Sequence, residues 1–459
     1  MTEELLKLFE QLEELFVNKK YNELKALLSD TEPADIAKFI EDNLEEIDQI
    51  RFFRLLPKDL ASDVFIETDS DTQEALIKAF TDKELKAVID DMFLDDAVDV
   101  IEEMPANVVK RILKNSDPQN RQQINELLEY PDDSAGSIMT TEFVSFSADM
   151  TVEQGFDKIR KTGINSETIY TCYVTDNRKH LIGVVTVKEM LLAGKTDVLR
   201  DIMDDSVITV ETLDDKEQVA MMLSKYDFLA LPVVDREGCL VGIVTVDDAV
   251  DVLQEEATED IQKMAAILPN EKPYLKQSIW SIWKARVPWL LLLMVSATFT
   301  GLILNTYEAS LSDISTVLIA CVPMLMDTGG NAGGQASVTI IRSIALGDIE
   351  FKDLFKVLWK EIRVSILLAA TLAVACFVKL TLIDNLLFGY KDYTPLLCLT
   401  VSLALFVTII MAKIVGCLLP LFAKKIKLDP AVMASPFITT IVDALSLMLF
   451  CAISIAILG

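Results

Sequence analysis

Long apolar runs after residue 270 constrain this chain more than any other feature of its sequence. A helix that crosses a bilayer needs about 20 mostly apolar residues, and each of these runs reaches that length. Because a helix satisfies its backbone hydrogen bonds internally, the runs predict a helical membrane domain. Five spans can be drawn, at about residues 287–307, 314–341, 358–382, 394–422 and 431–458.

Charges in the connecting segments indicate how these spans cross the membrane. Basic residues precede the first span, and more lie between the second and third and between the fourth and fifth. Since Lys and Arg are enriched in cytoplasmic loops, we expect a multi-pass protein of the cell membrane, with its N-terminus inside and its C-terminus outside. The basic residues are Lys276, Lys284, Arg286, Arg342, Lys352, Lys356, Lys360, Arg363, Lys424, Lys425 and Lys427.

The part of the chain before these spans is strongly acidic. Residues 1–270 contain 59 acidic and 27 basic residues, a net charge of −32, whereas residues 271–459 contain 12 and 15, a net charge of +3. An acidic field of this size repels nucleic acid and attracts cations. His180 is the only histidine and the seven cysteines form no C-x-x-C pair, so a zinc site is not expected. Cations that bind oxygen, such as Mg²⁺, fit this composition better.

Residues 1–130 show apolar residues at helical spacing, separated by breaks such as Leu56-Pro57 and Phe80-Thr81. We expect an all-α domain of stacked helix pairs. Within it, Asp95 and Asp99 lie four residues apart and share a helix face, where like charges repel. Such a run is ordinarily a solvated surface, and the alternative is a surface that binds cations.

Residues 137–253 contain one pattern twice. The run Leu181–Thr186 (LIGVVT) matches Leu240–Thr245 (LVGIVT), and Ser137–Thr140 (SIMT) matches Asp201–Asp204 (DIMD). Each copy predicts a strand, a helix, two further strands and a final helix, with a few extra residues in the first copy. The pattern resembles a tandem pair of CBS domains, an α/β regulatory module that often binds adenine nucleotides.

The CBS resemblance also implies a nucleotide site. In that family a Thr-x-x-Asp motif at the start of the final helix contacts ribose, and the helix N-terminus favours anions. The second copy has this motif at Thr245–Asp248, whereas the first copy carries Glu189 three residues after Thr186. The residues implied for an ATP site are Thr186, Lys188, Glu189 and Phe228.

The connector that follows is the most acidic run of the chain. On a helix, Asp248, Asp251, Glu255 and Glu259 share one face. Carboxylates this close together need counter-cations, unless the helix is simply solvated.

The last span carries polar residues at helical spacing. Ser435, Thr439, Asp443 and Ser446 are separated by four, four and three positions, so they line one face. A carboxylate near the middle of a membrane is costly to insert and usually marks an ion or substrate path. The other interpretation is a packing stripe whose Asp443 bonds to a neighbouring helix. Asp429 is expected to cap this helix at its start.

The second span is interrupted by the polar run Asp327–Gln335 (DTGGNAGGQ). Thr328, Asn331, Gln335 and Thr339 fall on one helix face. The overlapping G-x-x-x-G pairs permit either the close approach of another helix or an opened backbone that lines a wet cavity.

These motifs together resemble the MgtE family of magnesium transporters. The likeness is carried by the motif Thr328–Gln335, the pair Asp429-Pro430, the Asp443 stripe and the connector run Ala257–Lys263 (ATEDIQK), which follow a CBS pair. It implies a homodimeric Mg²⁺ channel that high cytoplasmic Mg²⁺ closes. The implied domains are a helical N domain (1–130), the tandem CBS pair (137–253), a plug helix with a juxtamembrane segment (254–285) and a five-span pore domain (286–459).

The resemblance further implies roles for individual residues. In the pore, Asp443 matches the ion-binding carboxylate, and Asn331 and Thr439 supply further oxygen atoms. Ser435 departs from the family pattern, since some relatives carry Asn there. The residues implied in cytoplasmic Mg²⁺ sensing are Asp95, Asp99, Asp215, Glu217, Asp227, Asp248, Asp251, Glu256, Glu259 and Asp260.

Two other functions fit some of these residues. Asp443 could carry protons in exchange for a divalent cation such as Mg²⁺ or Co²⁺. Asp327-Thr328-Gly329 also spells the triplet of aspartic proteases, with Asp443 as a partner. That triplet belongs to a β-rich loop, and here it lies in a helical pattern, so an enzyme is not expected.

Overall fold

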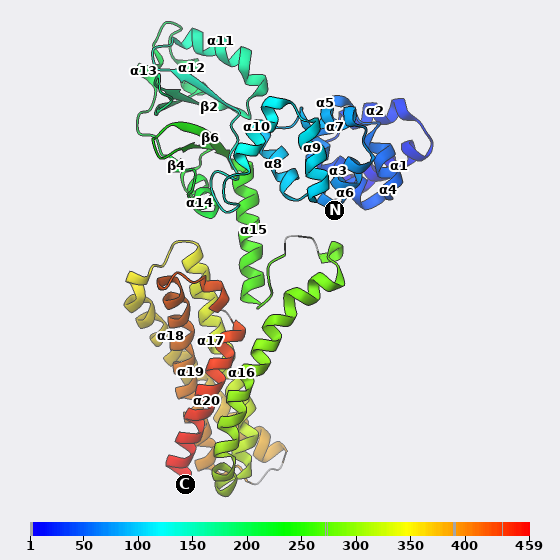
Figure 1. The fold of residues 1–459 in the computed structure, drawn as a ribbon. Helices are drawn as coiled ribbons and strands as arrows, with labels where there is room; N and C mark the ends of the chain where they lie inside the picture. The colour runs from blue at the N-terminus through cyan, green and yellow to red at the C-terminus, as the bar shows by residue number, and fades with distance from the viewer. Residues whose placement is uncertain (1–2, 271, 273, 389–391, 434) are drawn as a thin grey trace. The chain divides into compact units, whose positions relative to one another are not determined.

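The computed structural model describes residues 3–270, 272, 274–388, 392–433 and 435–459, and its contacts divide the chain into two units, Met1–Leu253 and Gln254–Gly459 (Figure 1). The first unit holds short helices and two small sheets, and the second holds the long apolar helices. This division confirms the multidomain fold class expected from the sequence, with an all-α part, an α/β pair and a helical membrane part.

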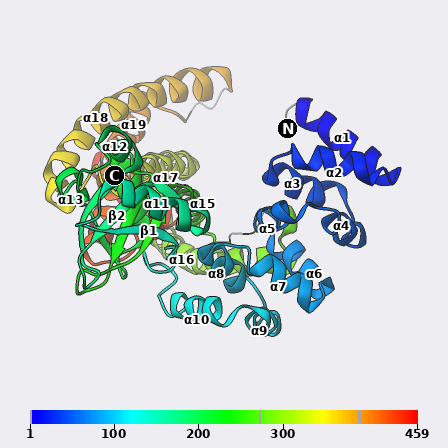
Figure 2. The same ribbon diagram turned by 90° about the horizontal axis from the view of Figure 1, so that it is seen from above.

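Short amphipathic helices follow one another along a curved stack at the start of the first unit (Figure 2). Their apolar faces meet in one core, in which Phe39 and Phe52 are fully buried with ring centroids 5.1 Å apart. The sequence breaks begin new helices as predicted, and Thr81 forms a capping box with Glu84. The helices are α1 (Glu3–Val17), α2 (Tyr21–Ser29), α3 (Pro33–Asn43), α4 (Glu46–Phe53), α5 (Lys58–Ile66), α6 (Ser70–Ala79), α7 (Asp82–Ile89), α8 (Leu94–Glu102), α9 (Ala106–Asn115) and α10 (Pro118–Leu127).

The internal repeat folds into two sheets with the same topology. In each copy the first strand pairs in parallel with the second, which pairs antiparallel with the third. The extra residues of the first copy form a short 3₁₀ turn at Gly163–Asn165. The first copy contains β1 (Phe143–Ser147), α11 (Val152–Thr162), β2 (Thr168–Thr175), β3 (Leu181–Thr186), α12 (Val187–Leu192) and α13 (Leu199–Ile202), and the second contains β4 (Val210–Glu211), α14 (Lys216–Tyr226), β5 (Ala230–Val234), β6 (Leu240–Thr245) and α15 (Val246–Met264).

The matched methionine and glycine motifs explain how the two copies are held together. A Cβ atom at Gly242 would lie 2.7 Å from the Sδ of Met139, and one at Gly183 would lie 2.5 Å from the Sδ of Met203. Each methionine therefore packs over a glycine of a β-strand, and Met139 of the first copy does so on the second copy's sheet. The two repeated sequence motifs, one with the methionine and one with the glycine, therefore form the same contact twice.

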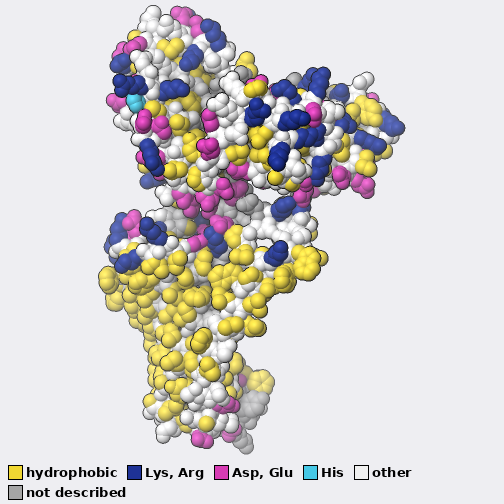
Figure 3. Space-filling view, viewed as in Figure 1, with side chains coloured by type: hydrophobic (Ala, Val, Ile, Leu, Met, Phe, Trp, Pro, Cys, Tyr) yellow, Lys and Arg dark blue, Asp and Glu magenta, His cyan; other side chains and the backbone are white. Residues whose placement is uncertain are grey.

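The second unit consists of long helices whose sides are apolar. Leu367, Val374 and Phe299 are more than 60% exposed on these sides, and Figure 3 shows apolar side chains over the flanks of the unit, with Lys and Arg gathered at one end. A surface of this kind suits lipid rather than water. The helices are α16 (Ile279–Ile314), α17 (Thr316–Ala345), α18 (Leu354–Val378), α19 (Pro395–Lys425) and α20 (Ser435–Leu458).

Among the described residues, four helical segments are long and apolar enough to cross a membrane: Ile279–Ile314, Phe351–Leu387, Pro395–Lys425 and Pro430–Leu458. Helix α17 is also long, but polar residues such as Asp327, Asn331 and Gln335 lower its mean hydropathy. A membrane crossing by α17, and with it the total of five spans, stays a prediction.

The last span begins differently from the prediction. Asp429 does act as a cap, because its Oδ1 accepts a hydrogen bond of 2.8 Å from the backbone N–H of Ala431. The following residues Pro430–Met433 form a short 3₁₀ helix, however, and α20 begins only at Ser435. The predicted single helix from residue 431 is therefore wrong at its start. Pro436 suits the first turn of α20, because its missing N–H is not needed there.

Helix α17 runs unbroken through its glycines. Gly329, Gly330, Gly333 and Gly334 are all buried within one continuous helix. The sequence allowed either close helix packing or an opened backbone at these glycines. The structure shows close packing within a continuous helix.

Candidate ion-binding sites

The polar stripe of α20 lies against the glycines of α17. A Cβ atom at Gly330 would lie 3.2 Å from Cγ2 of Thr439 and 3.5 Å from Oδ1 of Asp443. One at Gly329 would lie 2.9 Å from Oγ of Ser446. The stripe is thus a packing surface, but the side chains of Thr439 and Asp443 remain partly exposed. Ser435 is the first residue of α20, and its side chain lies outside the described part.

A second carboxylate joins Asp443 from α17. Asp327 is close enough to Asp443 to repel its charge, and its Oδ1 accepts a hydrogen bond of 3.2 Å from Nδ2 of Asn331. The structure therefore brings two carboxylates and one amide, from two helices, close to one another. The sequence suggested Asp327 only as part of a protease triplet. Asp327 lies four residues before Asn331, on the same helix face, and this spacing could have predicted that it joins the polar face of α17.

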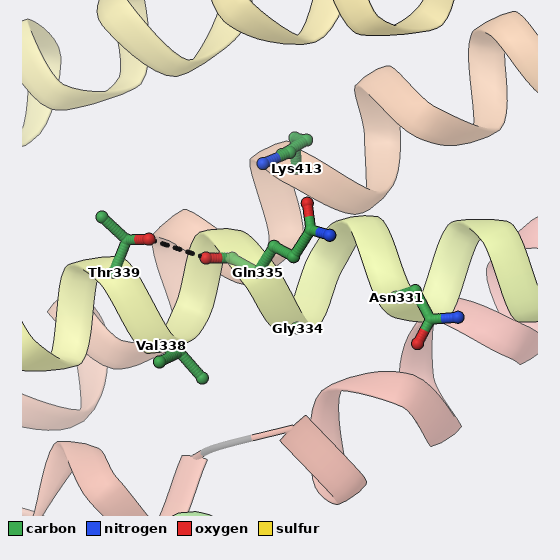
Figure 4. A pocket seen from close by; sticks show the side chains of 6 residues that line it. All are labelled: Asn331, Gly334, Gln335, Val338, Thr339 and Lys413. Atoms are coloured by element: carbon green, nitrogen blue, oxygen red, sulfur yellow. Dashed lines mark hydrogen bonds between the residues drawn. The ribbon is translucent and has the colours of Figure 1, made fainter. Parts of the chain in front are cut away.

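A cavity of about 770 Å³ continues the polar face of α17. Figure 4 shows Gln335 and Lys413 beside each other on this cavity, with Asn331 further along α17. The Thr339 hydroxyl donates a 2.8 Å hydrogen bond to the backbone oxygen of Gln335. The cavity is lined by Asn331, Gly334, Gln335, Val338, Thr339 and Lys413. Thr328 does not line it, and its hydroxyl donates to the backbone oxygen of Met324.

Two further glycines fix α17 against α19. A Cβ atom at Gly416 would collide with the backbone oxygen of Gly333, so the two helix backbones touch at this point. Small residues permit this close approach between membrane helices. The contact holds the polar face of α17 in place beside α20.

In the first unit, the predicted acidic residues of α8 and α15 come together. Asp95 is 7% exposed, and its Oδ1 has no hydrogen-bond partner among the described residues. Asp248 of α15 repels both Asp96 and Asp99 of α8. The ordinary interpretation of the α8 acids as a solvated surface is therefore wrong for Asp95. A buried carboxylate with one unbonded oxygen and several acidic neighbours is costly, which makes this cluster a candidate cation site.

The raised pKa values of the cluster follow from its crowding. Burial and the charge of Asp96 raise the pKa of Asp95 to about 7, and burial and the charge of Asp95 raise the pKa of Asp248 to about 7. Desolvation and the charge of Asp248 raise the pKa of Asp99 to about 8, although its side chain stays exposed at the edge of the cluster. Without a cation these carboxylates retain protons near neutral pH.

Sequence reasoning missed several members of this cluster. Burial and the charge of Asp95 raise the pKa of Glu167 to about 8, and its Oε2 lacks a hydrogen-bond partner among the described residues. Glu142 accepts a 2.9 Å hydrogen bond from the backbone N–H of Leu94, at the start of α8. The charges of Asp96 and Asp247 also act on Glu167. Glu142 and Glu167 stand alone in the sequence, so no local pattern indicates them.

The described residues also bear on whether a metal ion could be held directly by protein side chains. No three His, Cys, Asp or Glu side chains of the described residues meet in a geometry that holds a metal ion. Mg²⁺ usually keeps several water molecules and touches only one or two carboxylates, so a cluster of spaced carboxylates can still bind it through its hydration shell.

The remaining predicted sensing residues of the CBS pair lie at the two ends of α14. Asp215 caps the start of this helix and accepts hydrogen bonds from the backbone N–H groups of Glu217 and Gln218. Asp227 ends the helix in a left-handed conformation with φ of 54°. The structure therefore gives Asp215 and Asp227 local roles in the fold, and they do not join the Asp95 cluster.

The predicted acids Glu256, Glu259 and Asp260, near the end of α15, belong to the second unit. The ammonium of Lys263 lies 2.7 Å from Glu259 Oε1 and 2.7 Å from Asp429 Oδ2, so it bridges the end of α15 to the start of the last span. Burial and the charge of Asp429 raise the pKa of Asp260. Glu256 lies one turn before Asp260 on the same helix. Asp429 was predicted only as a helix cap.

The residues implied for ATP lie on α12 and near the end of α14. Glu189 already accepts hydrogen bonds from the backbone N–H (2.7 Å) and the hydroxyl (2.8 Å) of Thr186, so these two residues form a capping box. Lys188 is exposed, and the ring of Phe228 stacks on Tyr226 with centroids 5.5 Å apart. A nucleotide would have to compete with Glu189 for the start of α12.

Comparisons with known proteins cover almost the whole chain. Residues 322–453 match the MgtE family described as divalent cation transporters, residues 31–133 match the MgtE intracellular N domain, and residues 135–195 and 199–255 match CBS domains. The chain is 34% identical over 452 residues to the magnesium transporter MgtE of Thermus thermophilus, with 98% of each chain covered. It is 30% identical over 441 residues to the magnesium transporter MgtE of Bacillus subtilis, covering 95% of this chain and 94% of the relative.

Two solved structures resemble the first part of the chain. The cytosolic domain of the Mg²⁺ channel MgtE in complex with ATP is 33% identical with a TM-score of 0.51, over 53% of this chain and 99% of that one. The soluble part of a magnesium transporter is 32% identical with a TM-score of 0.52, over 55% of this chain and 99% of that one.

Proposed function

Because this chain belongs to the MgtE family of magnesium transporters, we propose that it conducts Mg²⁺ along the polar face between α17 and α20, with Asp443 as the main ion-binding residue. The observation that carries this proposal is the convergence of Asp443, Asp327 and Asn331 in a unit with apolar flanks. Mg²⁺ gives up water reluctantly, so carboxylate charge and amide or hydroxyl oxygens that reach its hydration shell suit it. Thr439 lies one turn before Asp443 on α20, where its methyl group packs on Gly330 and its hydroxyl donates a 2.9 Å hydrogen bond to the backbone oxygen of Pro436. Its lone pairs are proposed as further oxygen ligands of the hydrated ion.

We further propose that the working channel is a homodimer. A single chain offers one Asp443, whereas two copies around an axis would double the carboxylate charge on one ion path. The exposed polar face of α17, at Asp327, Asn331 and Gln335, is the surface that such a dimer would turn toward its axis.

The acidic first unit is proposed to lie in the cytoplasm and to sense Mg²⁺. The charges of Asp95 and Asp99 of the N domain interact with that of Asp248, and burial together with the charge of Asp251 raises the pKa of Glu67. Ions that bridge these surfaces would hold them together, while repulsion would separate them when Mg²⁺ is low. Each ion acts by preferring the closed state. The acids Asp215, Glu217, Asp227, Glu256, Glu259 and Asp260 remain candidates for further ions.

ATP binding is proposed at Thr186, Lys188, Glu189 and Phe228. The related cytosolic domain solved with ATP supports this proposal. The exposed Lys188 and the ring of Phe228 offer a phosphate contact and a stacking surface, respectively. ATP would displace the Glu189 carboxylate from Thr186, so its binding should be weaker than if that start of α12 were free.

Neither alternative function gains support. The two relatives that match nearly the whole chain are named magnesium transporters, and the related cytosolic domain belongs to a Mg²⁺ channel. Although Asp327 and Asp443 interact, Asp327 lies in a continuous helix and bonds to Asn331.

Neutralising Asp443 tests the proposed ion path. Asp443→Asn keeps the side-chain size, and removal of a charge from a membrane helix does not hinder insertion. We expect Mg²⁺ uptake into proteoliposomes to fall by about a hundredfold or more, since the main ion ligand is lost. Asp348→Asn, on the loop after α17, serves as a control and should conduct normally. Wild-type uptake by Asp443→Asn protein would refute the assignment.

A further inference from the structure

Lys413 is a cation buried within the membrane unit. It lies in α19 with its side chain 7% exposed, and its Nζ is 3.8 Å from Oε2 of Glu361 in α18, whose side chain is 15% exposed. Both residues fall in helical segments that are long and apolar enough to cross a membrane. Charged residues inside such segments are rare, and they usually face a water-filled cavity or the interior of the bundle.

The pair is poorly made for holding two helices together. Its separation of 3.8 Å is too long for a hydrogen bond, and Oε2 of Glu361 has no hydrogen-bond partner in the described part of the chain. Removing two charges from water is costly, and only excellent geometry offsets that cost. An apolar pair of similar volume would usually join α18 and α19 at least as well. Stability therefore gives little reason for Lys413 and Glu361.

The surroundings of Lys413 suggest a different reason. It lines the cavity that also contains Asn331, Gln335 and Thr339 (Figure 4). These three residues follow each other at four-residue intervals along α17, so the cavity continues the face that carries Asn331. Lys413 thus places a positive charge on the wall of the proposed ion path, next to the carboxylate of Glu361.

We propose that Lys413 sets the affinity of the ion path for Mg²⁺, because its charge neutralises Glu361 beside the path and lets Mg²⁺ pass instead of being trapped. The inference rests on the proposed conduction along α17. An ion must bind well enough to enter a path and weakly enough to leave it. An uncompensated Glu361 would attract Mg²⁺ twice as strongly as a monovalent ion at the same distance. A tethered ammonium supplies the counter-charge and cannot be carried away with the flux.

The test compares neutral variants of the full-length protein in proteoliposomes, with Mg²⁺ uptake measured against external Mg²⁺ concentration. For Lys413→Gln we expect the half-saturating concentration and the maximal flux to fall, the former by about tenfold, because Glu361 then holds the ion. For Glu361→Gln the half-saturating concentration should rise by about tenfold, because the ammonium is left uncompensated. The double variant should return to within about twofold of the wild type, since the net charge is restored.

A purely structural role predicts a different pattern. Both single variants would then lower the amount of folded protein or the maximal flux and leave the half-saturating concentration unchanged. The double variant would recover neither the amount of folded protein nor the maximal flux. That pattern overturns the proposal, as does a wild-type half-saturating concentration in Lys413→Gln. If the Lys413→Gln protein does not insert into the membrane, a wild-type half-saturating concentration in Glu361→Gln overturns the proposal instead.

Asp443→Asn in the same assay separates this inference from the proposed function. Lost uptake in Asp443→Asn together with an unchanged half-saturating concentration in Lys413→Gln overturns only the role of Lys413. Wild-type uptake in Asp443→Asn overturns the ion path itself.

Discussion

At the residue scale, the chain places carboxylates beside one another in partly or fully buried positions. Asp95 is buried with one oxygen unbonded in the described part of the chain, and Asp443 lies beside a second carboxylate on α17. Each arrangement is unfavourable for the protein alone and becomes favourable when a cation is present. This makes both groups of residues candidates for ion binding rather than for stability.

The Asp95 cluster predicts a pH dependence of stability in the absence of Mg²⁺. The pKa of Asp95 is near 3.8 in the unfolded chain and about 7 in the folded protein. Between these values the folded protein holds a proton that the unfolded chain has lost, so the free energy of unfolding falls as pH rises through that window. Mg²⁺ should restore stability at the upper end of the window, because it replaces the proton.

The Asp95→Asn variant should lose less stability than the wild type as the pH rises. At pH 8 in EDTA, we expect the variant to be more stable than the wild type by on the order of 1–3 kcal/mol, and this difference should shrink steadily as the pH falls from 7 toward 4. Urea unfolding of residues 1–270 measures this, since the soluble part of a relative has been solved as a separate protein. Asp205→Asn, at an exposed position, is the control. A wild-type pH profile in Asp95→Asn would contradict the account.

At the scale of elements, the sequence predicts most of the fold but only part of the sites. The periodicity of residues 1–130 and the repeated LxGxVT pattern were sufficient for the helical stack and the two sheets, because these patterns are local. Glu142 and Glu167 could not be found in the same way, since they meet Asp95 only through the contact between separate domains. Pro436 was a local signal for the break before α20, and it was missed.

The close contact of α17 and α19 predicts that Gly416 cannot be enlarged. In Gly416→Ala the new methyl group would meet the backbone of Gly333, which cannot move as a side chain can. We expect a loss of about 1–3 kcal/mol in stability and reduced Mg²⁺ uptake, because the polar face of α17 would shift. Thermal unfolding in detergent followed by size-exclusion chromatography checks the first effect.

Gly301 provides a matched control on α16. A Cβ atom there meets nothing within 4 Å, so Gly301→Ala should unfold at the wild-type temperature or slightly above it. Equal stability of the two variants would show that the α17–α19 contact is not as tight as described.

At the scale of the whole molecule, the chain joins an acidic unit to a unit with apolar flanks. The net charge of −32 in residues 1–270 opposes compaction unless counter-ions are bound. Mg²⁺ that binds the compact state therefore stabilises it, and the stabilisation grows with the logarithm of the Mg²⁺ concentration above the dissociation constant. Coupling of that state to the pore would make the transported ion its own inhibitor.

Mg²⁺ uptake into proteoliposomes with the Mg²⁺ concentration controlled on the side of the acidic unit tests this account most directly. Ionic strength is held constant, so that general screening is excluded. The account predicts rapid uptake by the wild type when that side is free of Mg²⁺ and strong inhibition when Mg²⁺ there is saturating. The variant with Asn at Asp95, Asp99, Asp248 and Asp251 should conduct at both concentrations. Equal wild-type uptake at both concentrations, or inhibition of the quadruple variant as strong as that of the wild type, would contradict it.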